Sequence, residues 1–372
     1  MKVLVCGGGT GGHIYPALAV VSELRRLGLT PGQFLWIGTH GQMEEELVPR
    51  ADIHLATITG GPIVGVPRLT MLKNSLLLLR SLVTTNRLLA NFNPDVLFLT
   101  GGYVNVPVTL VARLRRIPAV IYLPDIEPGR AITTLSRWVD KIACTSPASD
   151  QFLPADQLVP TGYPLRAQLR AATTLDRDQA LAAFDLTPQR PTLFVFGGSR
   201  GARTINNALM AALPQLLQSI QIIHISGQLD WPTVQSHAET LPADQAAYYR
   251  PYPYLHERMA AAFRAADLVL ARAGASMLGE GPAFGLPAIL VPYPYAWRYQ
   301  KVNADHLASK NAAIRLNDED LTAKMSDLVL DLIHDQDRLQ AMSTAAQALD
   351  TPEAATDIAH LLISLAHGGD HG

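Results

Sequence analysis

Residues 3–9 read VLVCGGG, and residues 193–199 read LFVFGGS. Each stretch is a short apolar run, typical of a strand buried on both faces, that leads into a glycine-rich turn and then into a helical pattern. Similar apolar runs alternate with helical patterns along the chain, which is typical of βαβ units. We therefore predict an α/β protein made of two Rossmann-like domains, each with a doubly wound parallel sheet.

The strands of these two sheets are expected in nine apolar runs. The runs are Lys2–Cys6, Phe34–Gly38, Asp95–Leu99, Ala119–Leu123 and Lys141–Thr145 in the first domain, and Thr192–Phe196, Gln221–Ser226, Leu268–Ala271 and Ala288–Val291 in the second. Pro160, Gly162 and Pro164 interrupt the pattern, so we place the N-terminal domain at residues 1–163 and the C-terminal domain at residues 164–350. Residues 351–372 are predicted to form a helix and a polar tail.

The composition excludes several classes of protein. The chain has 372 residues, of which 48% are hydrophobic, and its formal net charge is −2. The hydrophobic fraction is high enough to build folded cores, which excludes a disordered chain. Because the chain has no net basic charge, we expect no nucleic-acid partner. Cys6 and Cys144 lie in apolar runs and are predicted to be buried and unbridged. No run is long enough for a signal peptide or a membrane span, so we expect a cytoplasmic protein, either soluble or bound to a membrane surface.

The first glycine-rich turn lies in residues 7–16, GGGTGGHIYP. Glycines permit a ligand to approach the backbone closely, and the helix that follows presents free N–H groups that favour an anion. The turn is not a Walker A loop, because no Gly-Lys-Ser/Thr follows, and no acidic residue after the next strand marks a dinucleotide site. His13, whose imidazole can accept or donate a proton, is the candidate for acid–base chemistry. The alternatives are that the loop is only a tight turn and that His13 only caps the helix or packs against it.

Two turns in the second half have the same character. Residues 197–203, GGSRGAR, place Ser199 at the start of a helix, which suits a phosphate, although a turn flanked by solvated arginines is the alternative. Residues 272–288, RAGASMLGEGPAFGLPA, start another helix. Glu280 in its first turns offers a carboxylate to the two hydroxyls of a ribose. The alternative for Glu280 is an acidic residue that only interacts with the helix dipole.

A fourth motif, residues 292–304 (PYPYAWRYQKVNA), follows a predicted strand. It therefore lies at the carboxyl edge of a parallel sheet, where open α/β sheets bind ligands. Gln300 and Asn303 are candidate hydrogen-bond donors to a sugar. The alternative is that the aromatic side chains simply pack the loop.

In this order, the four motifs resemble those of the MurG family, bacterial transferases that add N-acetylglucosamine to lipid I, undecaprenyl-pyrophosphoryl-N-acetylmuramyl-pentapeptide, to form lipid II. The resemblance covers nearly the whole chain. The family's GGTGGH loop corresponds to Gly8–His13, its GGSxGA loop to Gly197–Ala202 and its GLPA segment to Gly285–Ala288. Its GGY segment corresponds to Gly101–Tyr103, and its GNPVR segment to Gly162–Arg166, which reads GYPLR here.

The resemblance implies the GT-B fold, in which two Rossmann-like domains face a cleft, and a donor site for UDP-N-acetylglucosamine. Leu255 would hold uracil through its backbone, Glu280 the ribose and Gln300 the sugar. The other residues that it assigns to the donor are Thr10, Gly11, Gly12, Asp125, Arg166, Ser199, Ala275, Ser276, Met277, Leu278 and Gly279. Asp125 stands where the family has asparagine, and the aromatic run 295–298 replaces polar residues before Gln300. These two changes bear on which donor sugar and which acceptor the chain uses.

The reaction implied is an inverting sugar transfer in which His13 acts as the base and helix N-termini stabilise the leaving UDP. We predict no cofactor and no obligatory metal. The alternatives are another GT-B lipid glycosyltransferase that uses a UDP-sugar, a UDP-sugar epimerase, and a non-catalytic protein that binds nucleotide sugars.

The acceptor implied is a polyprenyl lipid, so we expect a peripheral protein on the cytoplasmic face of the cell membrane that binds anionic lipid. Residues 69–90 place leucines at helical spacing, which favours an interfacial helix, although an ordinary core helix is the alternative. The basic residues of the predicted patch are Arg68, Lys73, Arg80 and Arg87, with a second cluster at Arg113, Arg115 and Arg116.

Overall fold

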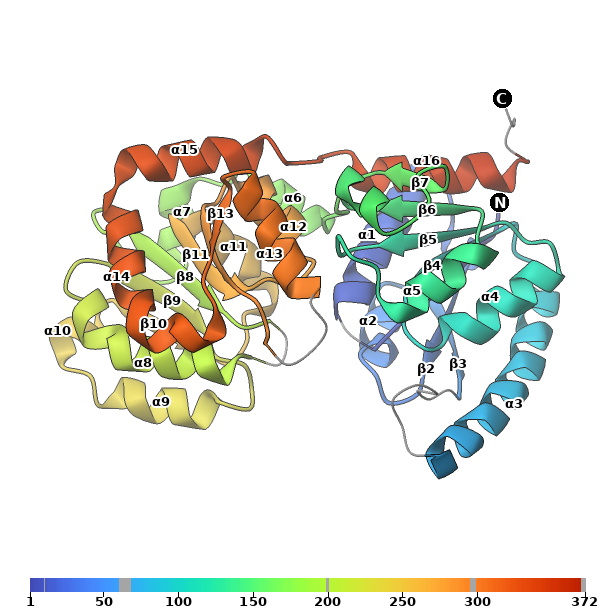
Figure 1. The fold of residues 1–372 in the computed structure, drawn as a ribbon, viewed down its shortest axis with the longest axis horizontal. Helices are drawn as coiled ribbons and strands as arrows, with labels where there is room; N and C mark the ends of the chain where they lie inside the picture. Colours follow the sequence, from blue (N-terminus) through green and yellow to red (C-terminus); the bar gives the residue numbers. More distant parts are fainter. Residues whose placement is uncertain (10, 60–67, 199–200, 295–298, 369–372) are drawn as a thin grey trace. The chain divides into compact units, whose positions relative to one another are not determined.

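A computed structural model of the chain divides into two units (Figure 1). The first unit comprises Met1–Arg166 and Thr351–Gly372, and the second comprises Ala167–Asp350. The structure describes residues 1–9, 11–59, 68–198, 201–294 and 299–368. Within 68–79 it describes the helical backbone and the side chain of Leu77 alone.

The first unit is built on a seven-stranded parallel sheet with the order β3-β2-β1-β4-β5-β6-β7. The strands are β1 (Val3–Gly7), β2 (Phe34–Thr39), β3 (His54–Ile58), β4 (Val96–Gly101), β5 (Ala119–Leu123), β6 (Lys141–Cys144) and β7 (Leu158–Pro160). The inner strands are buried on both faces, because their continuous apolar runs need cover from helices on either side. Cys6 and Cys144 lie in these strands as buried free thiols, as predicted.

Helices cover both faces of this sheet (Figure 1). They are α1 (Gly11–Arg26), α2 (Glu44–Arg50), α3 (Arg68–Phe92), α4 (Asn105–Leu114), α5 (Arg130–Leu135) and the C-terminal α16 (Ala354–Ala366). The C-terminal helix α16 returns to this unit and packs against α1 and β4, while Leu4 and Cys6 pack toward α4 and α5 through Val108 and Leu135. Among the described residues, no helix combines the length and apolar composition that a membrane span requires.

The second unit repeats the plan with a six-stranded parallel sheet in the order β10-β9-β8-β11-β12-β13. Its strands are β8 (Thr192–Phe196), β9 (Gln221–Ile225), β10 (Tyr249–Tyr252), β11 (Leu268–Arg272), β12 (Ala288–Val291) and β13 (Ala313–Arg315). Its helices are α6 (Ala167–Ala172), α7 (Arg177–Ala182), α8 (Arg203–Leu216), α9 (Trp231–Glu239), α10 (Ala243–Ala246), α11 (Met259–Ala265), α12 (Met277–Phe284), α13 (Tyr299–Ser309), α14 (Leu321–His334) and α15 (Gln336–Gln347).

The two faces of the second sheet have different cores. Leu193 and Val195 pack toward α8 and α14 in an aliphatic cluster. On the other face, Phe194, Phe196 and Phe263 form edge-to-face and tilted ring contacts at centroid distances of 4.8–5.7 Å. Apolar side chains therefore cover both faces of the second sheet.

Candidate active site

Each sheet has one place where the strand order reverses, and the glycine-rich turns lie there. In the first unit the chain proceeds from β1 outward to β2 on one side and from β4 outward to β5 on the other. Gly7 and Gly101 pair where β1 and β4 end, so the turns that follow these strands are neighbours. Ligands of open α/β sheets bind at this switch point.

His13 lies in the first turn of α1 at this switch point and is half-buried. Its Nδ1 is 3.1 Å from the carbonyl oxygen of Gly8, and its ring packs on Gly101. Gly11 and Gly12 precede it in the same helical turn. Thr10 lies outside the described residues, so its predicted contact stays a prediction.

A residue that the sequence motifs do not single out also holds this turn. Glu44, at the start of α2, is fully buried, and its carboxylate accepts hydrogen bonds from the N–H of Gly9 at 3.0 Å and the N–H of Thr39 at 2.9 Å. The carboxylate therefore ties the turn after β1 to the end of β2. Its sequence signal is weak, because Glu44 is the first of three consecutive glutamates and nothing local distinguishes it from the two exposed ones.

Two other predicted donor residues belong to the first unit. Arg166 is half-buried, with its guanidinium 4.2 Å from the ring centroid of Tyr15 on α1. Asp125 follows the end of β5 and is half-buried. The loop before it is held by the Thr145 hydroxyl, which lies 2.8 Å from the Pro124 carbonyl oxygen.

In the second unit the strand order reverses between β8 and β11, and the second and third motifs follow these two strands. The turn after β8 closes where the Gly201 N–H donates to the Gly198 carbonyl at 3.0 Å, and α8 then starts at Arg203. Ser199 lies outside the described residues. After β11, residues 274–276 are half-buried and lead into α12.

The helix α12 presents only part of its start to a ligand. Ala275 and Ser276 are partly accessible, whereas Met277, Leu278 and Gly279 are buried. Met277 and Leu278 therefore belong to the core by their side chains and could reach a ligand only through their backbone. Glu280 is half-buried in the first turn of α12.

A buried arginine braces this switch point. Arg272 at the end of β11 lies 2.5 Å from the Asp318 carboxylate and 2.7 Å from the Thr204 hydroxyl, and it also donates to the carbonyls of Val291 and Pro292. It thereby joins the ends of β11 and β12 to the start of α8. Sequence reasoning did not find this role, because an arginine at a strand end has no distinctive local pattern.

The fourth motif divides into a buried part and an accessible part. The Asn303 amide is buried and donates to the Ala273 carbonyl at 3.1 Å, so it supports the turn after β11 from within, in contrast to its predicted role as a sugar donor. Gln300 is half-buried, and its Oε1 accepts from the Tyr293 N–H at 2.9 Å. Residues 295–298 lie outside the described part of the chain.

Leu255 follows the edge strand β10. Its side chain is buried, and its carbonyl accepts from the Arg258 N–H at 2.8 Å. Only the backbone of Leu255 is thus available to a nucleobase. Among the described residues, no three histidine, cysteine or acidic side chains lie close enough together to hold a metal ion.

Comparison with known proteins assigns the family. Residues 3–144 match the Glycosyltransferase family 28 N-terminal domain, and residues 192–361 match the Glycosyltransferase family 28 C-terminal domain. The chain is 37% identical to the UDP-N-acetylglucosamine--N-acetylmuramyl-(pentapeptide) pyrophosphoryl-undecaprenol N-acetylglucosamine transferase of Roseiflexus sp., over 98% of this chain and 95% of that protein. It is also 37% identical to the protein of the same name from Halalkalibacterium halodurans, over 98% of this chain and 99% of that protein.

Solved structures agree with the sequence comparison. MurG of Acinetobacter baumannii superimposes with a TM-score of 0.76 at 26% identity, covering 98% of this chain and 99% of that chain. The UDP-GlcNAc 2-epimerase of Neisseria meningitidis, at 12% identity, has a TM-score of 0.69 over 98% of this chain and 100% of that chain, which is a similarity of fold alone. The GT-B fold predicted from the sequence is confirmed, and this chain belongs to the MurG family of glycosyltransferases, within glycosyltransferase family 28.

Proposed function

We propose that this chain transfers N-acetylglucosamine from UDP-N-acetylglucosamine to undecaprenyl-pyrophosphoryl-N-acetylmuramyl-pentapeptide, which yields lipid II. The observation that carries the proposal is the similarity over nearly the full length of relatives that are named for this transfer, at 37% identity. The two switch-point sites, one in each unit, support it, since a transferase needs one place for the donor and one for the acceptor.

The reaction exchanges one bond at the anomeric carbon of the donor. A hydroxyl oxygen of the muramyl sugar attacks this carbon from the face opposite UDP, the bond from carbon to the phosphate oxygen breaks, and UDP leaves with the electron pair. The attacking hydroxyl gives its proton to His13. Because His13 Nδ1 lies 3.1 Å from the Gly8 carbonyl, Nδ1 carries the hydrogen in the neutral ring and Nε2 has the lone pair that accepts the proton.

In this proposal, most of the residues that bind the donor belong to the second unit. Negative charge grows on the leaving diphosphate, and the N-terminal ends of α8 and α12 carry backbone N–H groups and positive dipole ends that stabilise it. Ser199, Ala275, Ser276 and the backbone of 277–279 are assigned to the diphosphate. Glu280 is assigned to the ribose, Gln300 to the sugar and the Leu255 backbone to uracil. From the first unit, Gly11, Gly12, Asp125 and Arg166 are assigned to the donor, together with Thr10.

The acceptor carries a lipid tail, so we propose that the first unit binds the cytoplasmic face of the membrane as a peripheral protein. Val83 on α3 and Leu114 at the end of α4 are 56% and 80% exposed. The Arg115 guanidinium donates to the Asn86 side chain at 2.9 Å, so the end of α4 lies beside α3. Among the side chains that the structure describes, exposed basic residues on α3 and at or directly after the end of α4 are Arg80, Arg87, Arg113, Arg115 and Arg116. Exposed apolar side chains on elements that also carry exposed arginines suit an anionic lipid surface.

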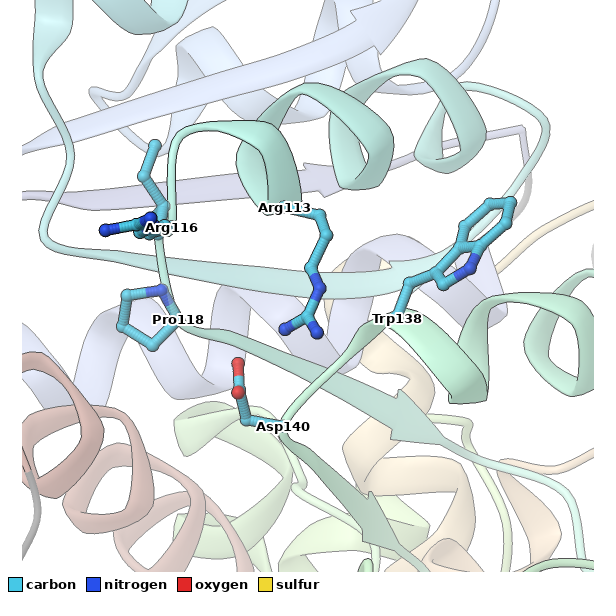
Figure 2. Close-up of a pocket in the computed structure, with 6 residues that line it drawn as sticks. Arg113, Arg116, Pro118, Trp138 and Asp140 are labelled. Atoms are coloured by element: carbon cyan, nitrogen blue, oxygen red, sulfur yellow. The ribbon is translucent and has the colours of Figure 1, made fainter.

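A pocket of about 450 Å³ opens beside this surface, between the end of α4 and the starts of β5 and β6 (Figure 2). Arg113 and Trp138 border it, and Figure 2 shows the Arg113 guanidinium pointing toward Asp140. Trp138 is 36% exposed, and an amphipathic ring beside basic residues is typical of the membrane interface.

A transfer assay with defined donors and acceptors tests the function. We expect label to pass from UDP-N-acetylglucosamine to a lipid I analogue, and to do so in the presence of excess EDTA. UDP-galactose as donor and diacylglycerol as acceptor are the comparison arms, and preferred transfer in either arm would identify a different lipid glycosyltransferase. Stabilisation against thermal unfolding by UDP-N-acetylglucosamine without transfer to any acceptor would identify a non-catalytic binding protein.

A further inference from the structure

The buried carboxylate of Glu44 is the feature that the proposed reaction does not use. Its side chain is fully buried, and burying an ionised carboxylate costs several kcal/mol unless hydrogen bonds replace the lost water. Oε1 accepts from both the N–H and the hydroxyl of Thr39, each at 2.9 Å, and Oε2 accepts from the N–H of Gly9 at 3.0 Å. Both oxygens are thus engaged by groups at the switch point.

The same carboxylate fixes Gly8 by contact. A methyl group built on the Gly8 α-carbon would lie 2.0 Å from Glu44 Oε1, so the Gly8 backbone rests directly on the carboxylate. On its other side, the Gly8 carbonyl lies 3.1 Å from His13 Nδ1 and would lie 3.2 Å from a methyl group built on Gly102. The Gly8–Gly9 backbone is therefore held between Glu44 and the His13 ring.

We propose that Glu44 is a positioning residue that sets the orientation and tautomer of His13 through the Gly8–Gly9 backbone. The inference rests on the proposed function, in which His13 is the base. With the turn fixed by Glu44, the Gly8 carbonyl faces Nδ1 and keeps the hydrogen on that nitrogen, so that the lone pair stays on Nε2. In this proposal Glu44 acts on His13 through the backbone at Gly8 and Gly9 and not by direct contact.

Replacement by glutamine separates this role from simple packing. Glutamine has nearly the same volume, but only one of its two terminal atoms accepts hydrogen bonds. In Glu44→Gln the amide NH₂ must therefore face either the Gly9 N–H or the two donors of Thr39, and the turn must shift. Glu46, two residues along α2, is exposed and pairs with Arg50 at 2.7 Å, so Glu46→Gln is the matched control.

A double-mutant cycle tests the proposal, with kcat measured at saturating donor and a lipid I analogue as acceptor. We expect Glu44→Gln to lower kcat by about 10- to 100-fold and to change the KM for UDP-N-acetylglucosamine by less than about threefold. Glu46→Gln should leave both within about twofold. On the His13→Gln background, Glu44→Gln should cost less than about threefold, because the residue through which it acts is gone.

The outcomes separate the two hypotheses. Unchanged activity in His13→Gln would remove the base assignment and leave Glu44 with nothing to position. A costly His13→Gln combined with a Glu44→Gln loss that multiplies in full in the double variant would overturn the positioning role alone. A Glu44→Gln variant with the parent's kcat would overturn it as well.

A measurement on the unaltered protein applies even where Glu44→Gln fails to fold. The nitrogen NMR shifts of the His13 ring, assigned by their loss in His13→Gln, report which nitrogen carries the hydrogen when the ring is neutral. We expect a protonated Nδ1. A protonated Nε2 would break the link from Glu44 through Gly8 to the lone pair and overturn the proposal.

Discussion

The imidazole ring of His13 lies against the α-carbon of Gly101, so closely that a methyl group on that carbon would meet Cδ2 at 2.7 Å and Nε2 at 2.8 Å. Gly101 ends β4, the strand that pairs with β1 at the switch point, and its φ is +119°. A side chain is thus excluded both by the neighbouring ring and by the backbone conformation. Gly101 thus contacts the Cδ2–Nε2 edge of the His13 ring, whereas the Gly8 carbonyl contacts Nδ1.

Gly101→Ala should therefore displace His13. We expect kcat to fall by about 100-fold and the free energy of unfolding to fall by about 1–3 kcal/mol, because the ring must move and the backbone is strained. Gly32→Ala is the control, since a methyl group there meets no atom within 4 Å and φ is not in the left-handed region. Equal kcat in the two variants would show that His13 tolerates displacement and weaken its assignment as the base.

His13→Gln tests the base directly. The amide cannot accept the proton from the attacking hydroxyl, so we expect kcat to fall by roughly 10²- to 10⁴-fold, while UDP affinity, measured by calorimetry, changes little. A loss of less than about tenfold would move the proton acceptor elsewhere. Asp125 or Glu127, in the loop after β5, would then be examined next.

Glu280→Ala tests the ribose contact. If the carboxylate accepts hydrogen bonds from the ribose hydroxyls, its removal should weaken UDP binding by about 10- to 100-fold, the loss of charge-assisted hydrogen bonds. Glu239, exposed at the end of α9, provides a control with the same change of charge. UDP dissociation constants that agree between Glu280→Ala and the parent would refute the assignment.

The sequence predicts the inner strands of both sheets and misses the edge strands, and the reason is burial. The nine apolar runs correspond to β1, β2, β4, β5, β6, β8, β9, β11 and β12, with ends shifted by a residue or two at most. The four missed strands, β3, β7, β10 and β13, are the outer strands of the two sheets. A strand covered by neighbours on both sides needs a continuous apolar run, whereas the edge strand His54–Ile58 is mixed in polarity and partly exposed, and the edge strand Leu158–Pro160 is only three residues long.

The candidate site likewise has one part that the sequence predicts and another that only the structure shows. Glycine-rich turns are visible in the sequence, because glycine at a strand end has few other uses, and they led to His13 and the start of α12. Glu44, Arg272 and the buried role of Asn303 depend on contacts between segments far apart in the chain. No local pattern encodes such contacts, so only the folded structure reveals which polar residue supports the turns from within.

A buried histidine makes the second unit sensitive to acid. His224 on β9 has Nδ1 2.7 Å from the Tyr249 hydroxyl and Nε2 2.9 Å from the Asn206 side-chain oxygen. The Asn206 amide donates to the Ser226 carbonyl at 2.9 Å, so its oxygen is the acceptor for Nε2–H, and the Tyr249 hydroxyl donates to Nδ1. This arrangement suits the neutral ring, and burial lowers the pKa of His224 to about 3.

The sign of the pH effect follows from this lowered pKa. In the unfolded chain His224 takes up a proton as the pH falls below 6.5, its ordinary pKa, while in the folded protein it stays neutral until about pH 3. The contribution of His224 to the free energy of unfolding is therefore fully present above pH 6.5 and decreases by about 1.4 kcal/mol per pH unit between there and about pH 3. The free energy of unfolding, measured by chemical denaturation between about pH 6 and 4, should change less with pH in His224→Gln than in the parent. His334→Gln, which removes an exposed histidine, should keep the parent's slope, and a parent slope in His224→Gln would contradict the prediction.

Membrane binding is tested by removing charge from one surface at a time. Each arginine near an anionic surface adds about 1 kcal/mol, so the combined replacement of Arg80, Arg87, Arg113 and Arg116 by glutamine should abolish co-sedimentation with vesicles rich in phosphatidylglycerol or cardiolipin. All these side chains are exposed, so the variant should stay folded and bind UDP as the parent does. Replacing Lys301, Lys310, Lys324 and Arg338 by glutamine makes the same change in net charge on the second unit, and that variant should still co-sediment. Parent binding should weaken with added salt, because the attraction is screened.

Two outcomes would change the assignment of the membrane surface. If the first variant still binds vesicles, Arg68 and Lys73 at the start of α3 are the next pair to replace. If the second-unit variant loses binding instead, the membrane surface does not lie on α3 and α4.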